Sequence, residues 1–263
     1  MSDGDPSVRE VRTLFEGALA ERTRALVERF RTDTRSGVVA CVAAAERRLE
    51  RADAEVLRIE GLLAMETSLR AAGFTAIAGI DEVGRGALAG PVTAAAVVLR
   101  SGVCLDGLDD SKRLTPEARL RVRERLLVAC VASCVAHAWP DEIDSLGIGA
   151  ATRNAMRRAL EGLGLAVDHV IVDGLPLRLH PAETAVVGGD AKVACVAAAS
   201  VLAKVERDAL MCSLSREHPH WGFERHKGYG SADHLSAIAE AGLSPIHRRS
   251  FAPCGGTGRL FDG

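Results

Sequence analysis

The sequence predicts an α/β protein in which a mixed β-sheet is flanked by helices, with a helical hairpin before the sheet and a helical segment at the C-terminal end. Residues 7–71 are rich in Ala, Glu, Arg and Leu and lack strand-like runs. From residue 74 onward, two strand-like runs come first and helices and strands then alternate, an order typical of a mixed sheet with helices on its faces. The 263 residues are 48% hydrophobic, which is enough for one large core and an appendage.

The N-terminal segment carries apolar residues at helical spacing in two rows. These rows are Phe15, Leu19, Leu26 and Phe30, and then, at intervals of seven, Val42, Leu49, Val56 and Leu63. The intervening DTRSG interrupts the pattern, so the segment predicts a shorter and a longer helix folded back as a hairpin. A heptad row can also mark a dimer seam, but so few repeats are more typical of a helix packed on its own hairpin partner. We therefore expect a monomer with a separable extension at 1–73, a main domain at 74–254 and a flexible tail at 255–263.

The main domain contains a clear set of strand and helix candidates. Strands are expected at 76–80, 92–99, 131–138, 169–173 and 184–187, and helices at 115–129, 151–163, 191–214 and 231–242. Thr115 and Ser231 are predicted N-caps, and Pro116 takes the first position of its helix, where an N–H is not needed. Active groups in such sheets gather beyond the strand ends.

The composition excludes several classes of protein. No apolar stretch is long enough to span a bilayer, and the acidic, polar start MSDGDPSVRE is unlike a secretory leader, so we expect a cytoplasmic protein without a membrane partner. The seven cysteines include no C-x-x-C pair, which argues against a disulfide framework or a zinc site.

A net charge of -2 gives no basic domain, so a nucleic-acid partner has to be argued from local patches. The best patches are Arg225, His226 and Lys227 in ERHKGYG, and His247, Arg248 and Arg249 in HRRSF. The alternative for each patch is ordinary solvated surface.

Acidic residues stand at the ends of several predicted elements. Asp81 and Glu82 end a short apolar run and are followed by Gly-Arg-Gly, Asp173 ends a second strand, and Asp190 precedes the long helix. Each acid alone has an ordinary explanation as a turn or cap residue, and Asp208 inside that helix is expected to form an ion pair. Carboxylates converging from separate elements, however, are what two-metal phosphoryl chemistry requires.

Strand geometry limits how two of these acids can act. Successive residues of a strand face opposite sides, so Asp81 and Glu82 cannot both point at one metal from a regular strand. Glu82 must lie where the strand bends, or act through its carbonyl group or a water molecule. Asp81 and Asp173 are therefore the strongest candidates for direct ligands.

The chain resembles ribonuclease HII, the bacterial type 2 ribonuclease H, across about 74 to 254. The resemblance is carried by AGIDEVGRGALAGPV, DDSKRLTPEAR, EIDSLGI, VIVDG, GGDAK, AAASVLAKVERD, HKGYG and SPIHRRSF, in family order. It implies a ribonuclease H-like fold and hydrolysis of the RNA strand of RNA/DNA hybrids, with cutting at ribonucleotides embedded in duplex DNA. It also implies 5'-phosphate and 3'-hydroxyl ends and a Mg²⁺ or Mn²⁺ cofactor.

The resemblance assigns roles to particular residues. Asp81, Glu82 and Asp173 become metal ligands, and Asp190 is the fourth acidic member of the catalytic set. For substrate binding, the resemblance gives a role to Tyr229, for which the alternative is a ring that covers the sheet edge, while residue chemistry adds Gly84, Arg85 and Gly86 and, as individually weak phosphate contacts, Lys112, Lys192 and Lys227. Among them the Gly-Arg-Gly backbone can approach the sugar, and Tyr229 packs on the sugar at the RNA-DNA junction and bonds the 2'-hydroxyl. The rival hypotheses are a catalytically silent hybrid-binding module, which intact acids argue against, and a DNA-cutting enzyme, which the ribose-reading groups argue against.

Overall fold

The computed structural model describes residues 5–103, 105, 107–109, 111 and 114–255. Contacts divide the chain into two compact units, Met1–Glu60 and Gly61–Gly263. The predicted flexible tail at 255–263 lies, apart from its first residue, outside the described residues. Among the helices of the described ranges, none combines the length and apolar character needed to cross a membrane.

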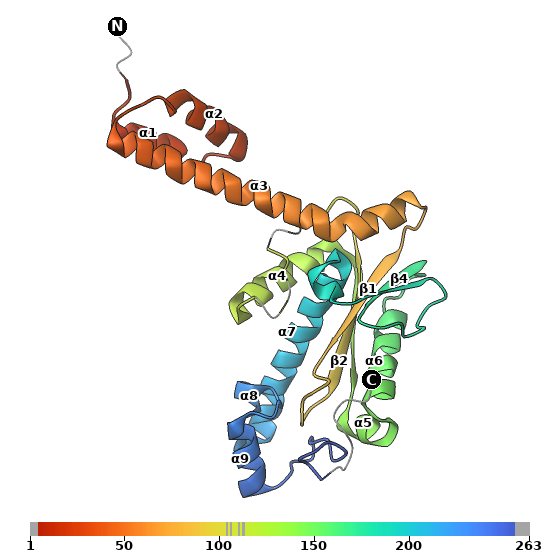
Figure 1. The fold of residues 1–263 in the computed structure, drawn as a ribbon. Helices are drawn as coiled ribbons and strands as arrows, with labels where there is room; N and C mark the ends of the chain where they lie inside the picture. The colour runs from red at the N-terminus through yellow and green to blue at the C-terminus, as the bar shows by residue number, and fades with distance from the viewer. Residues whose placement is uncertain (1–4, 104, 106, 110, 112–113, 256–263) are drawn as a thin grey trace. The chain divides into compact units, whose positions relative to one another are not determined.

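The N-terminal unit is helical, as predicted, but its first helix is interrupted. The unit contains α1 (Val8–Phe15), α2 (Ala20–Phe30) and the first part of α3 (Ser36–Ala71) (Figure 1). The prediction of one continuous helix before DTRSG was wrong, because Gly17 has a φ of 69° and Leu19 is 82% exposed, where a buried helical position had been expected.

A small apolar core holds this unit together. Its buried members are Val11, Phe15, Leu26, Phe30, Val38, Val42 and Ala45. Along α3 the predicted heptad row does not form one buried stripe, since Val56 is 56% exposed while Val42 is buried.

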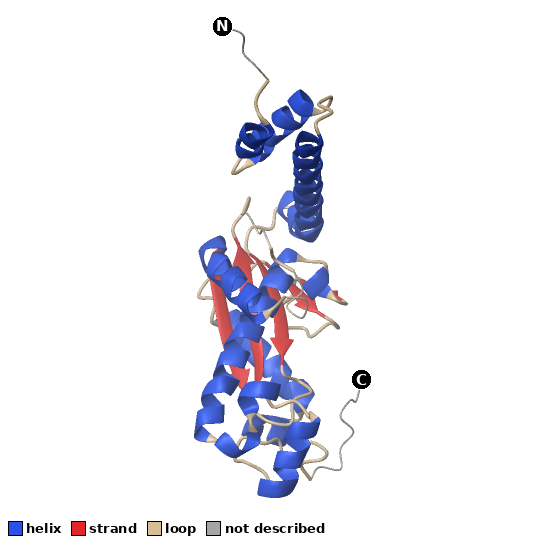
Figure 2. Ribbon diagram, turned by 90° about the vertical axis from the view of Figure 1, so that its left-hand side faces the viewer, coloured by secondary structure: helices blue, strands red, loops and turns tan. Residues whose placement is uncertain are grey.

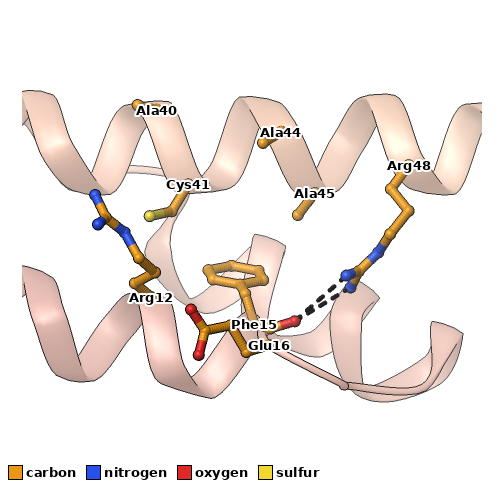
Figure 3. Close-up of a pocket in the computed structure, with 8 residues that line it drawn as sticks. All are labelled: Arg12, Phe15, Glu16, Ala40, Cys41, Ala44, Ala45 and Arg48. Carbon is orange, nitrogen blue, oxygen red and sulfur yellow. Dashed lines mark hydrogen bonds between the residues drawn. The ribbon is translucent and has the colours of Figure 1, made fainter.

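Side chains from α1 and α3 line a pocket of about 340 Å³, in which the ring of Phe15 points toward Cys41 and Ala45 (Figure 3). The guanidinium of Arg48 donates to the carbonyl oxygen of Phe15 at 3.4 Å and to the hydroxyl of Thr23 at 2.8 Å. One α3 side chain therefore holds the end of α1 and the start of α2.

The second unit is built on a five-stranded mixed sheet, which confirms the predicted fold class. The strands are β1 (Ile77–Val83), β2 (Val92–Leu99), β3 (Cys130–Ala138), β4 (His169–Asp173) and β5 (Glu183–Val186). They are ordered β3-β2-β1-β4-β5, with β2 antiparallel to both of its neighbours and β4 parallel to β1 and β5. Each observed strand begins and ends within two residues of its predicted bounds, except that β1 ends three residues later than predicted, at Val83.

The helices of this unit largely match the predicted ones. They are α4 (Pro116–Ala129), α5 (Pro140–Leu146), α6 (Ile148–Glu161), α7 (Ala194–Glu217), α8 (Phe223–His226) and α9 (Ala232–Ala241), with short 3-10 turns η1 (Gly189–Ala191) and η2 (Pro219–Trp221). Both predicted caps are confirmed, because the Thr115 hydroxyl accepts from Ala118 N–H and the Ser231 hydroxyl accepts from His234 N–H. The short helices α5 and α8 were not predicted.

Helices cover both faces of the sheet (Figures 1 and 2). On one face Ala78 and Ile80 of β1 pack in the main apolar cluster with residues of α6. On the other face α7 crosses β1 so closely that a Cβ atom at Gly79 would overlap the backbone of Cys195. Only glycine fits there, and the contact sets the distance between β1 and α7.

The last turns of α3 belong to the second unit. The side chain of Glu66 is buried, and its Oε1 accepts from Cys195 N–H at 2.8 Å, in the first turn of α7. Val193, at the N-cap of α7, supplies no side-chain cap, so this carboxylate satisfies a backbone donor at the positive end of the helix dipole. The predicted domain limit at 73 stays a prediction, but Glu66 already serves the sheet-bearing unit.

We expect Glu66→Ala to lower the free energy of unfolding by about 1–3 kcal/mol, because the Cys195 N–H is left buried without an acceptor. Glu66→Gln keeps an acceptor oxygen and should cost less. Urea denaturation of the full chain, followed by circular dichroism, measures both changes.

Glu60→Ala is the matched control, since Glu60 is an exposed residue of the same helix. A pair of truncations extends the test, because removing 1–60 keeps Glu66 and removing 1–73 does not. Equal stability of the two truncated chains would contradict the proposed capping role.

Candidate active site

Two of the predicted acids lie side by side at the ends of parallel strands. The register pairs Ile80 of β1 with Val172 of β4, so Asp81 and Asp173 are the next residues on neighbouring strands. Asp81 follows Gly79 by two positions and therefore faces α7, where it is 5% exposed. The structure thus brings together the two acids that strand geometry favoured as direct ligands.

Burial and neighbouring acids raise the proton affinity of Asp81 and Glu82. Burial is the main cause that raises the pKa of Asp81 well above its usual range, and the charges of Glu82 and Asp173 add to this effect. Burial also raises the pKa of Glu82, Arg85 opposes the shift across a 3.4 Å ion pair, and Asp173 increases it. The three carboxylates therefore share one electrostatic site, whose repulsion a bound cation would relieve.

Hydrogen bonds hold Asp81 in place. Its Oδ1 accepts from Glu82 N–H at 2.7 Å, and the Ser200 hydroxyl of α7 forms a further hydrogen bond that favours the charged carboxylate. The Ser200 and Ser111 hydroxyl oxygens lie 2.9 Å apart, which links Asp81 through Ser200 to Ser111. Sequence reasoning missed Ser200, although a serine in the otherwise apolar run AAASVLA was an available signal.

A backbone contact holds Asp173, close in sequence to Asp190. Gly189 N–H of η1 donates to Asp173 Oδ1 at 2.7 Å, and the next residue is Asp190, which is 6% exposed. Asp208 lies apart and forms the predicted ion pair, at 2.7 Å from Lys204 Nζ, with Arg119 at 3.9 Å.

The structure leaves two of the predicted roles of Glu82 open, a contribution through its carbonyl group or one through a water molecule. Strand β1 remains paired with β2 beyond Glu82, as far as Val83, so the strand does not bend at Glu82. In the part of the chain described here, no group of three or more His, Cys, Asp or Glu side chains is placed so that it could hold a metal ion by itself. Mg²⁺ is commonly bound by one or two carboxylates, water and substrate phosphate, and an all-oxygen set of mutually repelling carboxylates fits that mode.

A buried arginine, Arg248, holds the Gly-Arg-Gly loop after β1 through hydrogen bonds to its backbone. Arg248 is fully buried, and its guanidinium donates to the carbonyl oxygens of Gly84 at 2.7 Å, Arg85 at 2.8 Å and Gly90 at 3.0 Å. Burial lowers the pKa of Arg248 to about 9, and Arg207 adds to this shift. The carbonyl dipoles of the loop take the place of water around this charge.

A second buried arginine joins the loop to HKGYG. Arg207 of α7 donates to the carbonyl oxygens of Pro91 at 2.9 Å, Ala89 at 3.2 Å and Lys227 at 2.9 Å. Its guanidinium carbon lies 5.4 Å from the ring centroid of Tyr229. This one side chain therefore connects the loop after β1 with the predicted sugar-reading tyrosine.

One predicted nucleic-acid patch was wrong. His247 is 1% exposed and Arg248 is fully buried, so two of the three basic residues of HRRSF face the interior, and only Arg249 is exposed. Backbone carbonyl groups, rather than solvent or phosphate, surround the Arg248 charge.

The predicted substrate-binding residues fall into different environments. Arg85 and Gly86 are exposed and Tyr229 is 37% exposed, whereas Gly84 is buried because Arg207 occupies the space of its missing side chain. The backbone N–H of Leu88, at the far end of the loop, donates to the carbonyl oxygen of Gly228 at 2.8 Å, so Tyr229 follows a residue bound to that loop.

The predicted lysines can be placed in part. Lys192 is exposed and its Nζ donates to the carbonyl oxygen of Val187 at 2.6 Å, and Lys227 Nζ donates to the carbonyl oxygen of Glu224. Lys112 lies outside the described residues.

Comparison with known families assigns both parts of the chain. The family model described as Ribonuclease HII matches residues 78–254, and the model of the Ribonuclease HII N-terminal domain matches residues 7–70. The chain belongs to the ribonuclease HII family. It is therefore a ribonuclease H endonuclease, and the family cleaves the RNA strand of RNA/DNA hybrids and depends on divalent metal ions.

Curated relatives match nearly the whole chain. Ribonuclease HII of Bacillus licheniformis is 40% identical over 247 residues, which cover 94% of this chain and 96% of the relative. Ribonuclease HII of Geobacillus kaustophilus is 46% identical over 226 residues, covering 86% and 87% of the two chains.

Solved structures of ribonucleases H share the fold. Ribonuclease H2 of Pyrococcus horikoshii matches with a TM-score of 0.59 and 26% identity, covering 68% of this chain and 95% of that one. RNase HII of Archaeoglobus fulgidus, solved in complex with PCNA, matches with a TM-score of 0.56 and 26% identity over 66% of this chain and 94% of that one. Bst-RNase HIII in complex with Mn²⁺ has a TM-score of 0.55 at 19% identity, over 69% and 68% of the two chains, and supports the fold alone.

The two glycines of the loop should respond differently to alanine. Gly84 has a φ of 90°, and an added Cβ would overlap Arg207, so Gly84→Ala should cost about 1–3 kcal/mol from backbone strain, before the overlap is counted. Gly86 has open space around its Cα, so Gly86→Ala should stay within about 0.5 kcal/mol of the parent chain. Urea denaturation measures both values, and a stable Gly84→Ala protein would show that the loop does not depend on close approach of Arg207.

Proposed function

We propose that this enzyme cuts the RNA strand of hybrids and also cuts at single ribonucleotides embedded in duplex DNA, by two-metal-ion catalysis with Mg²⁺ or Mn²⁺. The products carry 5'-phosphate and 3'-hydroxyl ends. The observation that carries the proposal is the pairing of Asp81 and Asp173 at adjacent strand ends, directly before a loop whose exposed residues can meet a sugar-phosphate chain.

The carboxylates of Asp81 and Asp173 would anchor the two cations, and Glu82, acting through its carbonyl group or a water molecule, would complete the site together with Asp190. When bound, the cations supply a polarised phosphate and a water molecule with a lowered pKa. Raised proton affinity at Asp81 and Glu82 fits this role, because such carboxylates gain most from a neighbouring positive charge.

The protein's own contribution is orientation. The Ser200 hydroxyl and the Glu82 N–H hold Asp81, and Gly189 N–H holds Asp173, so these oxygens are fixed before substrate arrives. Groups fixed in advance need no rearrangement as charge develops on the phosphate, and this is a large source of rate enhancement.

Recognition of the ribonucleotide is assigned to the loop and to Tyr229. The 2'-hydroxyl both donates and accepts hydrogen bonds, so backbone groups of Gly84, Arg85 and Gly86 together with the Tyr229 hydroxyl can distinguish it from a deoxyribose. The exposed guanidinium of Arg85 can also pair with a phosphate. Lys112, Lys192 and Lys227 would add phosphate contacts.

The direct test compares three end-labelled substrates with Mg²⁺: a duplex with one ribonucleotide, an RNA/DNA hybrid and an all-DNA duplex. Cleavage of the first two and not the third is expected. On 3'-labelled substrate, enzymatic ligation of the labelled product checks its 5'-phosphate, and primer extension from the other product checks its 3'-hydroxyl.

Asp81→Asn and Asp173→Asn should each lower kcat by more than about a hundredfold, because each removes a charge from the cation site. Binding of the hybrid should be largely retained, since the residues assigned to contact phosphate are untouched. Single-turnover cleavage at saturating Mg²⁺ and fluorescence anisotropy with labelled hybrid measure the two effects.

Asp208→Asn is the matched control, because Asp208 forms an ion pair outside the acid cluster and its loss should be milder in catalysis. Near-normal cleavage by Asp81→Asn would remove the basis for the metal assignment.

Replacements of Tyr229 should separate ring packing from hydrogen bonding. Tyr229→Phe loses one hydrogen bond, of about 0.5–1.5 kcal/mol, and Tyr229→Ala loses the ring contact as well, of about 1–3 kcal/mol. The loss in kcat/KM should be larger on the single-ribonucleotide duplex, which offers one 2'-hydroxyl, than on a long hybrid. An equal loss on both substrates, with unchanged circular dichroism, would mean that Tyr229 supports general binding instead.

A further inference from the structure

Three histidine side chains form a connected cluster behind Tyr229. The rings of His226 and His234 stack with centroids 4.3 Å apart and planes at 14°, and Nε2 of His234 lies 3.0 Å from Nε2 of His247. His234 is fully buried and His247 is 1% exposed. None of the three contacts the acids of the cation site, so the cluster needs another explanation.

The hydrogen bonds determine where each ring carries its proton. The Ser244 N–H donates to Nδ1 of His247 at 2.8 Å, so this nitrogen is an acceptor and the neutral ring carries its proton on Nε2. That proton is donated to Nε2 of His234, which leaves the His234 proton on Nδ1. From there it is donated to the carbonyl oxygen of Tyr229 at 2.9 Å.

His226 completes the arrangement from the other side. Its Nδ1 accepts from Gly228 N–H at 3.2 Å, so its proton is on Nε2, which donates to the carbonyl oxygen of Trp221 at 2.7 Å. Histidines therefore hold the N–H of Gly228 and the carbonyl group of Tyr229, the two peptide groups that flank the Gly228–Tyr229 link.

The arrangement requires neutral rings. A proton added to Nε2 of His234 would face the proton on Nε2 of His247. Either the hydrogen bond between the two rings would be lost, or the His247 proton would move to Nδ1 and the hydrogen bond from Ser244 N–H would be lost. Burial lowers the pKa of His247 to about 4, and burial also lowers the pKa of His234 and of His226. The charged and titratable neighbours of the cluster are His218, Glu224, Arg225 and Asp233.

Other contacts fix the opposite side of the same short segment. Gly228 presents its carbonyl oxygen to the N–H groups of Leu88 and Ala89, and Arg207 lies against the ring of Tyr229. The backbone of Tyr229 is therefore held between the loop after β1 on one side and the histidine chain on the other.

We propose that the chain Ser244–His247–His234 is a positioning device that fixes the Tyr229 backbone, and with it the angle at which the Tyr229 ring meets the sugar. The inference rests on the proposed sugar-reading role of Tyr229. It makes His234 and His247 specificity-determining positioning residues, although neither touches substrate. Loss of the His234 hydrogen bond leaves the Tyr229 carbonyl oxygen with Ser231 N–H, at 2.8 Å, as its remaining donor, and changes selectivity for a single ribonucleotide more than it changes cleavage itself.

The proton positions can be tested without substrate. Nitrogen-15 NMR of the histidine-labelled full chain near neutral pH distinguishes the two neutral tautomers, and single His→Gln variants assign the signals. The expected result is Nδ1–H at His234 and Nε2–H at His226 and His247. The opposite tautomer at His234 or His247, or a charged ring, would overturn the proposal.

Kinetics test the consequence. His234→Ala and His247→Ala should each lower kcat/KM on the single-ribonucleotide duplex by about 3- to 10-fold, the scale of one lost hydrogen bond, with a smaller loss on a long hybrid. His234→Asn places an amide N–H where Nδ1–H stood and should recover most of the selectivity. His220 is exposed and lies outside the Ser244–His247–His234 hydrogen-bond chain, so His220→Ala should leave kcat/KM on both substrates unchanged.

A double-mutant cycle separates positioning from a general loss of stability. Adding His247→Ala to Tyr229→Ala should cause no further loss of selectivity, because the side chain being positioned is already gone. Additive losses, or unchanged selectivity in His234→Ala and His247→Ala, would overturn the inference while leaving the role of Tyr229 intact. An unchanged preference in Tyr229→Ala alone would instead refute the proposed role of Tyr229, and the inference with it.

Discussion

The geometry of the loop after β1 and of HKGYG depends on two buried guanidinium groups whose hydrogen bonds end on backbone carbonyl oxygens. Moving an ion out of water costs several kcal/mol. For Arg207 and Arg248 this cost is offset by the six carbonyl groups that accept hydrogen bonds from them. Those carbonyl groups come from the segment after β1 and from HKGYG, while the arginines come from α7 and the C-terminal segment. All four segments must be in place together, since an incomplete set would leave a buried charge without partners.

The sequence predicted the elements whose formation depends on their own pattern. The strands β1, β2 and β4 are apolar runs, and α4 begins at a Thr-Pro cap, so local residues were enough to find them. The first N-terminal helix was predicted incorrectly because the hydrophobic spacing continues across Gly17, whereas the helical backbone conformation is interrupted there. Helix α8 has only four residues and follows a left-handed glycine, and such short turns are fixed by tertiary contacts.

The candidate site was predictable in the same selective way. Asp81 and Asp173 could be paired because the ends of neighbouring parallel strands meet at one edge of a sheet, which needs only the strand positions. Burial of His247 and Arg248 could not be predicted, because HRRSF reads as a solvated basic run until the carbonyl groups that surround it are known. Ser200 was hidden for the opposite reason, since a small residue in an alanine-rich helix looks like packing.

Helix α7 sets the distance between the acid site at Asp81 and the segment that contains Tyr229. Ser200, which holds Asp81, and Arg207, which holds the loop and contacts Tyr229, stand seven residues apart on one continuous helix, or about 10 Å at the usual rise. Two full turns bring both side chains to nearly the same face, whereas one inserted residue would rotate them about 100° out of phase. An insertion or deletion between residues 200 and 207 would therefore separate the Ser200 contact with Asp81 from the Arg207 contacts with the loop, even if the helix itself stayed intact.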